Sequence, residues 1–123
     1  MARILLIDDE EIVRFTLRTA LEMGLHKVVE AEDGEQATEL LSESSFDLVI
    51  TDIVMPKKEG VQTILDIKAN YPDTKIIAIT GGDPARSGLY LKTAGILGAD
   101  KVLLKPISDA HLTEAIDTCL SGT

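Results

Sequence analysis

The most constraining feature of this sequence is a set of five short apolar runs that are rich in valine and isoleucine. They span residues 4–7, 27–31, 48–50, 76–79 and 102–104. Most of these runs lack polar alternation, so we expect strands that are covered on both faces. Stretches long enough for a helix separate the runs. This alternation predicts an α/β fold, in which five helices cover both faces of a five-stranded parallel sheet.

Helical periodicity and helix boundary signals appear between the apolar runs. Apolar residues recur at spacings of three and four residues, as they do on the buried face of an amphipathic helix. The third helix should end before Pro72, and Ser108 suits the N-cap of the last helix. The fourth helix, residues 84–97, is the least regular because Gly88 and Gly95 interrupt it. Each glycine costs about 1 kcal/mol relative to alanine inside a helix.

Length, charge and cysteine content narrow the class of protein. The 123 residues suit a single domain spanning residues 1–123. The net charge is −9 and the only adjacent basic pair is Lys57-Lys58, so we expect no direct binding to nucleic acid. The single cysteine, Cys119, favours a reducing compartment and hence the cytoplasm. The first apolar run is too short to span a membrane, so no membrane association is expected.

Polar side chains stand where four of the apolar runs end. Asp8 and Asp9 follow the first run, Asp52 the third, Thr80 the fourth and Lys105 the fifth. The carboxyl ends of parallel strands meet at one edge of a sheet, where ligands bind in folds of this class. We therefore expect these side chains to converge. The glutamates that follow Asp9 are interpreted only as an acidic helix start.

The expected cluster combines three carboxylates with a hydroxyl and an ammonium group. Carboxylates that share a pocket repel one another unless a cation lies among them. Oxygen ligands without a nearby histidine or cysteine favour Mg²⁺ over zinc. The charge of Lys105 and the hydroxyl of Thr80 suit phosphoryl transfer, which depends on positioning and charge neutralisation. An aspartate can act as the nucleophile and form an acyl phosphate.

Together these motifs resemble the receiver domains of two-component response regulators along the whole chain. Four places carry the resemblance: the acidic pair Asp8-Asp9, the segment Thr51–Pro56 with Asp52, the hydroxyl of Thr80, and Lys105-Pro106 with its commonly cis proline. The resemblance implies a flavodoxin-like (βα)5 fold with strand order 2-1-3-4-5.

The resemblance also implies a role for each residue. Asp52 would accept a phosphoryl group from a sensor histidine kinase or a histidine phosphotransfer protein. The ligands of Mg²⁺ would be Asp8, Asp9, Asp52 and the backbone carbonyl of Val54. Lys105 and Thr80 would gather around the phosphate oxygens, and movement of Thr80 and its loop would alter the binding of a downstream effector protein. Such a chain catalyses only its own phosphorylation and dephosphorylation.

One position departs from the family pattern. The family usually has an aromatic residue three positions before the lysine, where this chain has Val102. Either the output surface is recognised differently, or Tyr90 takes over the role of the missing ring.

Several alternatives stay open at this point. An aspartate-based, Mg²⁺-dependent phosphohydrolase also forms an acyl phosphate, but the haloacid dehalogenase type carries a DxD motif after its first strand. A flavodoxin-like FMN protein would have its phosphate repelled by Asp8 and Asp9. A degenerate receiver, which only binds partners, would lack some of the motif residues. The chain could also be a receiver cut from a longer regulator, and either a monomer or a weak dimer.

Overall fold

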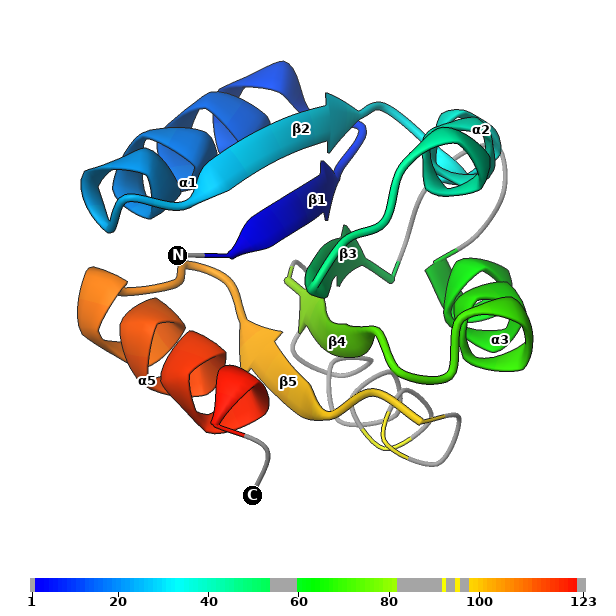
Figure 1. Cartoon of the computed structure of the whole chain (residues 1–123). Helices are drawn as coiled ribbons and strands as arrows, with labels where there is room; N and C mark the ends of the chain where they lie inside the picture. The colour runs from blue at the N-terminus through cyan, green and yellow to red at the C-terminus, as the bar shows by residue number, and fades with distance from the viewer. Residues whose placement is uncertain (1, 54–59, 82–91, 93–94, 96–97, 122–123) are drawn as a thin grey trace.

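The computed structural model describes residues 2–53, 60–81, 92, 95 and 98–121. Five parallel strands form one sheet in the order β2-β1-β3-β4-β5, which confirms the predicted strand order (Figure 1). The strands are β1 (Arg3–Ile7), β2 (Lys27–Ala31), β3 (Leu48–Asp52), β4 (Lys75–Thr80) and β5 (Lys101–Leu104). The helices are α1 (Glu11–Met23), α2 (Gly34–Glu43), α3 (Gly60–Asn70) and α5 (Asp109–Leu120). The predicted fourth helix, residues 84–97, lies almost entirely outside the described residues.

The sheet is buried between two layers of helices. Helices α1 and α5 cover one face, and α2 and α3 cover the other (Figure 1). Within β1, Ile4 and Leu6 pack in the α1–α5 layer, whereas Leu5 and Ile7 pack in the α2–α3 layer. Both sets of side chains are fully buried, which explains why the strand lacks polar alternation.

Helix boundaries follow the signals in the sequence. The Ser108 hydroxyl caps α5 by accepting a hydrogen bond of 3.1 Å from the His111 N–H. Asp33 caps α2 in the same manner through the N–H of Gln36, at 2.9 Å. Helix α3 ends at Asn70, before the proline. Within the described part of the chain, no helix has both the length and the apolar character needed to cross a membrane.

The strand order reverses direction at β1, which places the first helices on opposite faces of the sheet. Strand β1 pairs with β2 on one side and with β3 on the other. Asp52 and Thr80 are the last residues of β3 and β4, and Lys105 follows β5 directly. Because all the strands are parallel, these residues and the aspartates after β1 lie at the same edge of the sheet.

Candidate functional site

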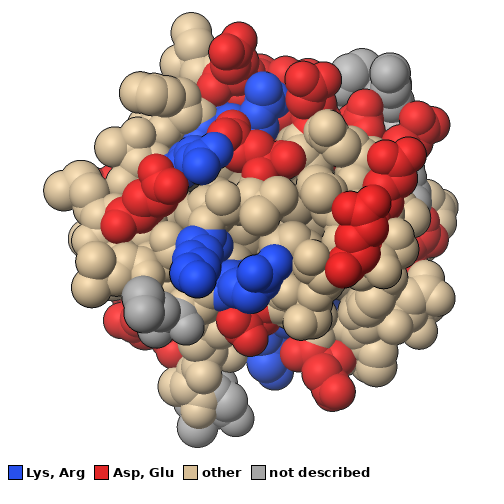
Figure 2. Space-filling model, turned by 45° about the horizontal axis from the view of Figure 1, so that its top comes forward, with Lys and Arg blue, Asp and Glu red and all other residues tan. Residues whose placement is uncertain are grey.

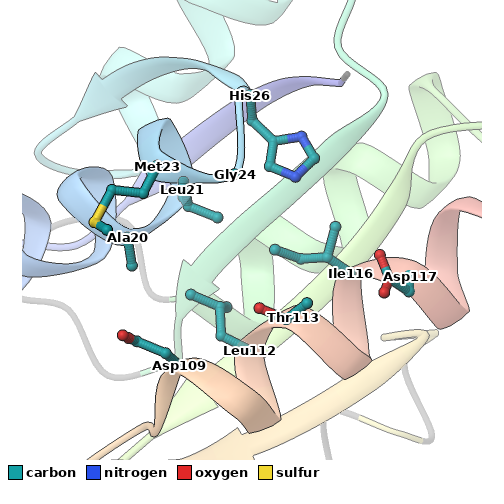
Figure 3. Close-up of a pocket in the computed structure, with 10 residues that line it drawn as sticks. All are labelled: Ala20, Leu21, Met23, Gly24, His26, Asp109, Leu112, Thr113, Ile116 and Asp117. Atoms are coloured by element: carbon teal, nitrogen blue, oxygen red, sulfur yellow. The ribbon is translucent and has the colours of Figure 1, made fainter.

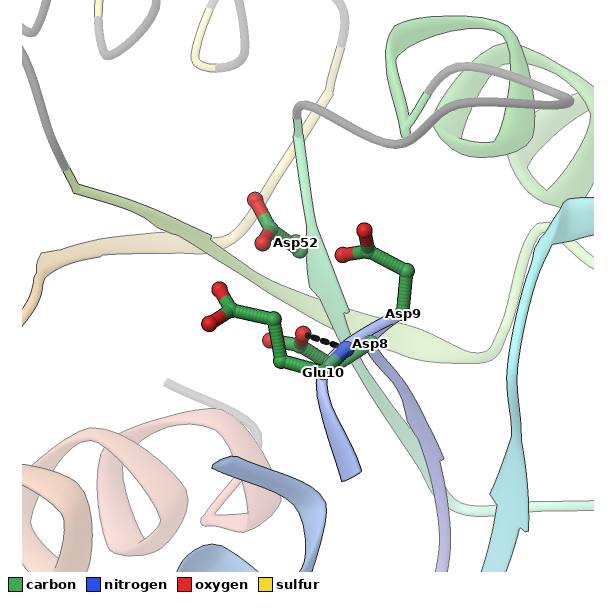
Figure 4. A group of neighbouring side chains, drawn as sticks. All are labelled: Asp8, Asp9, Glu10 and Asp52. Carbon is green, nitrogen blue, oxygen red and sulfur yellow. Dashed lines mark hydrogen bonds between the residues drawn. The ribbon is translucent and has the colours of Figure 1, made fainter. Parts of the chain in front are cut away.

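Four acidic side chains meet at the carboxyl edge of the sheet. Carboxylate oxygens of Asp8, Asp9, Glu10 and Asp52 all lie within 4.8 Å of one another (Figure 4). Asp8 and Asp52 are buried, whereas Asp9 and Glu10 are exposed. The cluster therefore has a buried floor and an open side through which a small ion or a phosphoryl group could enter.

The ammonium group of Lys105 joins the two buried carboxylates. Its Nζ lies 2.9 Å from Oδ2 of Asp52, 3.1 Å from Oδ2 of Asp8 and 3.5 Å from Oε1 of Glu10. Burial by itself would lower the pKa of Lys105, but its hydrogen bond to Asp52 and the negative charges of Asp52 and Asp8 outweigh burial and raise that pKa. Lys105 therefore stays protonated at neutral pH.

Asp8 is held in place by the backbone around it. Its N–H donates to the carbonyl of Ala31 at 3.2 Å, and its Oδ1 accepts the N–H of Glu10 at 2.9 Å. Burial raises the pKa of Asp8, and the charge of Asp52 adds to that increase, while the Glu10 N–H and Lys105 oppose it. A further positive charge in the cluster would favour the ionised form of Asp8.

The donor set fits a hard divalent cation. The buried Oδ2 of Asp8 is ion-paired with Lys105 but has no hydrogen-bond partner among the described residues. One ammonium group cannot balance four clustered carboxylates, and every ligand atom that the described residues offer in this cluster is an oxygen. These properties match Mg²⁺, which prefers carboxylate ligands and usually retains several water molecules.

Thr80 carries a buried hydroxyl at the carboxyl end of β4. Its side chain is fully buried, and its Oγ1 forms no hydrogen bond among the described residues. Its carbonyl accepts the N–H of Lys105 at 2.7 Å, which ties the ends of β4 and β5 together. An unpaired buried hydroxyl is costly, so a site that supplies an acceptor for it would be favoured.

The structure therefore brings together Asp8, Asp9, Asp52 and Lys105, as the sequence predicts. The Lys105-Pro106 bond is cis, as the family resemblance implies. The predicted ligand Val54 lies outside the described residues, as do Lys57, Lys58 and Tyr90. Val102 is partly buried and packs against the α2–α3 layer.

Glu10 also belongs to this cluster, although its sequence context indicates only an acidic helix start. It is the N-cap residue of α1, yet its side chain makes no capping hydrogen bond. Its carboxylate faces Lys105 instead. Its spacing of two residues from Asp8, together with the pairing of its N–H with Asp8 Oδ1, places it here, and the spacing was the only signal available in the sequence.

The charges on the surface are mixed. On the face drawn in Figure 2, basic side chains lie in small groups among acidic ones. This distribution agrees with the net charge of −9. The absence of nucleic-acid binding stays a prediction.

A second concave surface lies between α1 and α5 (Figure 3). Apolar side chains such as Leu112 and Ile116 line it, together with His26, Asp109 and Asp117. The described residues that line it include no lysine or arginine and none of the predicted site residues. It therefore lacks the positive charge that a phosphoryl group would require.

Comparisons with known proteins agree with this geometry. A sequence model of the family described as the response regulator receiver domain matches residues 4–117. Transcriptional regulatory protein CpxR of Escherichia coli K12 is 38% identical over 121 residues, which cover 98% of this chain and 50% of CpxR. Protein CcdB of Bacillus subtilis strain 168 is 35% identical over 117 residues, which cover 94% of this chain and 95% of CcdB. This chain thus spans about half of CpxR but nearly all of CcdB.

A solved structure shows the same fold. Response regulator protein TrrA of Thermotoga maritima, in complex with Mg²⁺-BeF, aligns with a TM-score of 0.83 and 32% sequence identity. The alignment covers 98% of this chain and 100% of the TrrA chain.

Gly81 provides a first test of how Lys105 is positioned. A Cβ at residue 81 would lie 2.7 Å from the Cβ of Lys105, so Gly81→Ala must displace the lysine or the strand end. We expect the free energy of unfolding to fall by about 1–3 kcal/mol, as for other overpacked sites. Gly95→Ala is the control, because an added Cβ there meets no atom within 4 Å. Urea unfolding of both variants measures the difference, and equal stabilities would contradict the close approach at Gly81.

The unpaired hydroxyl of Thr80 gives a second test. Thr80→Val removes the hydroxyl without breaking a hydrogen bond, so the unphosphorylated chain should be as stable as the wild type or more stable by up to about 1–3 kcal/mol. Thr51→Val is the matched control, because the buried Thr51 hydroxyl donates to the carbonyl of Asp52 at 2.9 Å. This control should lose about 0.5–1.5 kcal/mol. Equal destabilisation of the two variants in urea would mean that Thr80 has a partner in the unphosphorylated state.

Proposed function

This chain belongs to the response regulator receiver domain family of two-component signalling, and we propose that its Asp52 accepts a phosphoryl group from a partner protein that carries phosphohistidine. The observation that carries the proposal is the 2.9 Å contact between the ammonium of Lys105 and a carboxylate oxygen of Asp52, beside the buried Asp8. A nucleophilic carboxylate, a fixed cation and further acidic ligands are the parts that phosphoryl transfer to aspartate requires.

The proposed reaction is a direct exchange of one phosphorus bond for another. A carboxylate oxygen of Asp52 forms a bond to phosphorus while the bond from phosphorus to the histidine nitrogen breaks, and the nitrogen keeps the electron pair. Lys105 pairs with negative charge on Asp52 before transfer and remains close to the phosphoryl oxygens afterwards. Because the ammonium is already held in place by two carboxylates, little reorganisation accompanies the reaction.

We propose Asp8, Asp9 and Asp52 as the residues that hold Mg²⁺, with the backbone carbonyl of Val54 as a further ligand. When bound, Mg²⁺ supplies positive charge that offsets the repulsion between the carboxylates and the incoming phosphoryl oxygens. The buried Oδ2 of Asp8, which has an ion pair with Lys105 but no hydrogen-bond partner among the described residues, supports this assignment, as does the tight grouping of carboxylate oxygens.

Thr80 is proposed as the group that senses the phosphoryl group. Its buried hydroxyl has no hydrogen-bond partner in the described part of the chain, so a phosphoryl oxygen within reach would satisfy it. A phosphoryl group brings nearly two negative charges and three acceptor oxygens, and drawing Thr80 toward it would move the loop that follows β4. The downstream effector protein would recognise the altered loop surface. Receiver domains typically have no catalytic activity beyond this chemistry.

The partner would approach over an apolar surface beside the site. On α1, Ile12 is 80% and Phe15 is 70% exposed. Ile12 also lines a groove that includes Lys105, Pro106 and Ile107, so this groove adjoins the acceptor. A protein that brings phosphohistidine to Asp52 must cover the surface next to Lys105, and exposed apolar side chains are suited to such a contact. The cytoplasmic location and the monomeric or weakly dimeric state stay predictions.

Phosphorylation of Asp52 is tested by intact-mass spectrometry after the addition of phosphoramidate and Mg²⁺. We expect the wild-type chain to gain a labile phosphoryl mass that requires the metal, and Asp52→Ala to gain none. Asp47→Asn is the control, since this aspartate lies just before β3, at the other end of the strand from Asp52; it should be phosphorylated like the wild type. A mass gain that survives in Asp52→Ala would assign the acceptor elsewhere, and turnover of a simple phosphate ester would favour the phosphohydrolase.

The docking surface is tested by comparing two phosphodonors. Phe15→Ala should slow phosphorylation by a histidine phosphotransfer protein that phosphorylates the wild type, by about tenfold, as expected for an exposed aromatic anchor worth 1–2 kcal/mol. Phosphoramidate should phosphorylate the variant at the wild-type rate, because this small donor needs no docking surface. Met23→Ala is the control on the same helix, where Met23 is 80% exposed. Equal slowing with both donors would refute docking at Phe15.

A further inference from the structure

Arg14 is a buried arginine that contacts the backbone of the acidic site. It lies on α1 and is only 9% exposed. Its Nη1 donates to the backbone carbonyl of Asp8 at 2.6 Å, and this hydrogen bond is itself buried. Arg14 makes no ion pair with the acidic cluster among the described residues; its charge is paired with Glu30 on β2, whose Oε1 lies 3.1 Å from Nε.

We infer that Arg14 is a positioning residue, which fixes the Asp8 peptide and thereby sets the affinity of the acidic cluster for a divalent cation. This inference rests on the proposed function, in which Asp8 and Asp9 hold Mg²⁺.

The contacts around Asp8 show what Arg14 adds. Strand pairing holds the Asp8 N–H on the carbonyl of Ala31, and the Glu10 N–H holds Oδ1. The carbonyl of Asp8 is the start of the peptide that leads to Asp9, and Arg14 is its donor. With the N–H, the carbonyl and one carboxylate oxygen all held, Oδ2 is the atom that remains for Lys105 and a cation. Fixing the peptide therefore fixes the direction of both aspartates.

The guanidinium is itself held in place from two sides. Nε binds Glu30, and the second oxygen of Glu30 accepts Nη1 of Arg18 at 2.6 Å. Arg18 also pairs with Glu22 at 3.3 Å, so a short chain of ion pairs runs along α1 and β2. The planar guanidinium can direct separate N–H groups to a carboxylate and to a carbonyl, which the single ammonium of a lysine does poorly.

The energetics favour positioning over simple stabilisation. The desolvation cost of burying a charged pair offsets much of the attraction between the two charges. A buried ion pair is therefore weak evidence for stability by itself. Residues that orient metal ligands through such contacts typically change metal affinity by about 10–100-fold when replaced. A long-range charge effect would act in the opposite direction, because removing a positive charge near the cluster should strengthen cation binding.

Loss of positioning and loss of positive charge therefore change the affinity for Mg²⁺ in opposite directions, and this difference gives the test. The Kd for Mg²⁺ is measured by isothermal titration calorimetry on the unphosphorylated chain, at a temperature where circular dichroism shows each variant folded. Arg14→Met keeps the aliphatic stem but loses the donors, and we expect its Kd to rise about tenfold or more. Arg18→Met is the matched control: it removes one positive charge and an ion pair with the same Glu30 but no contact with Asp8. Its Kd should equal that of the wild type or be lower.

Further variants keep the test decisive. Arg14→Lys retains the charge and should still bind Mg²⁺ less tightly than the wild type; Glu30→Gln retains Arg14 and should weaken binding less than Arg14→Met does. Thermal unfolding in EDTA reports any purely structural effect, which would lower the melting temperature and leave the Kd unchanged. An Arg14→Met Kd within twofold of the wild type, or below it, overturns the inference while the proposed function stands. If the wild-type chain binds no Mg²⁺, the proposed function itself fails.

Discussion

The arrangement on which the site depends is one ammonium group shared by two buried carboxylates, with the three residues supplied by three different strand ends. Asp8 follows β1, Asp52 ends β3 and Lys105 follows β5. None of the three could be buried alone without a large desolvation cost. Together they form a buried charged cluster at the base of the site. Its excess of negative charge suits a metal ion, and the ammonium group of Lys105 suits a phosphoryl group.

The backbone at the end of β4 packs closely against Lys105. The Lys105 N–H binds the carbonyl of Thr80, and the side chain of Lys105 passes so close to Gly81 that a Cβ there would collide with it. The end of β4 therefore fits the lysine, and it also carries the Thr80 hydroxyl, for which the described residues provide no hydrogen-bond partner. Lys105 thus contacts both Thr80 and Gly81 directly, so a shift in the position of the lysine would be felt at the end of β4.

Much of this arrangement could be predicted from the sequence because it depends on patterns that are local along the chain. Apolar runs predict the buried strands. The rule that ligands bind at the carboxyl ends of parallel strands then places Asp8, Asp52 and Lys105 at one edge of the sheet. The cap of Ser108 on α5 is likewise a local signal. The family resemblance supplied the strand order and the cis proline.

The features that escaped prediction depend on contacts between segments. In the sequence, Glu10 looks like an ordinary acidic residue at the start of a helix. Its side chain lies near Lys105 only because the fold brings the carboxyl ends of β1 and β5 to the same edge of the sheet. Arg14 lies among the polar residues of α1, and its burial follows from the packing of that helix over β2, where Glu30 faces it. Periodicity can place a residue on a helix face, but it cannot identify the partner on another strand.

The most direct test of the account follows backbone amide signals by NMR as Mg²⁺ and beryllofluoride are added, since the fluoride complex resembles an aspartyl phosphate. The account predicts that the largest shifts fall on Asp9, Asp52, Thr80, Gly81 and Lys105, and that Asp52→Asn abolishes the shifts that require beryllofluoride. Shifts that centre on the groove between α1 and α5, or that persist in Asp52→Asn, would contradict the claim that the carboxyl edge of the sheet is the phosphoryl site.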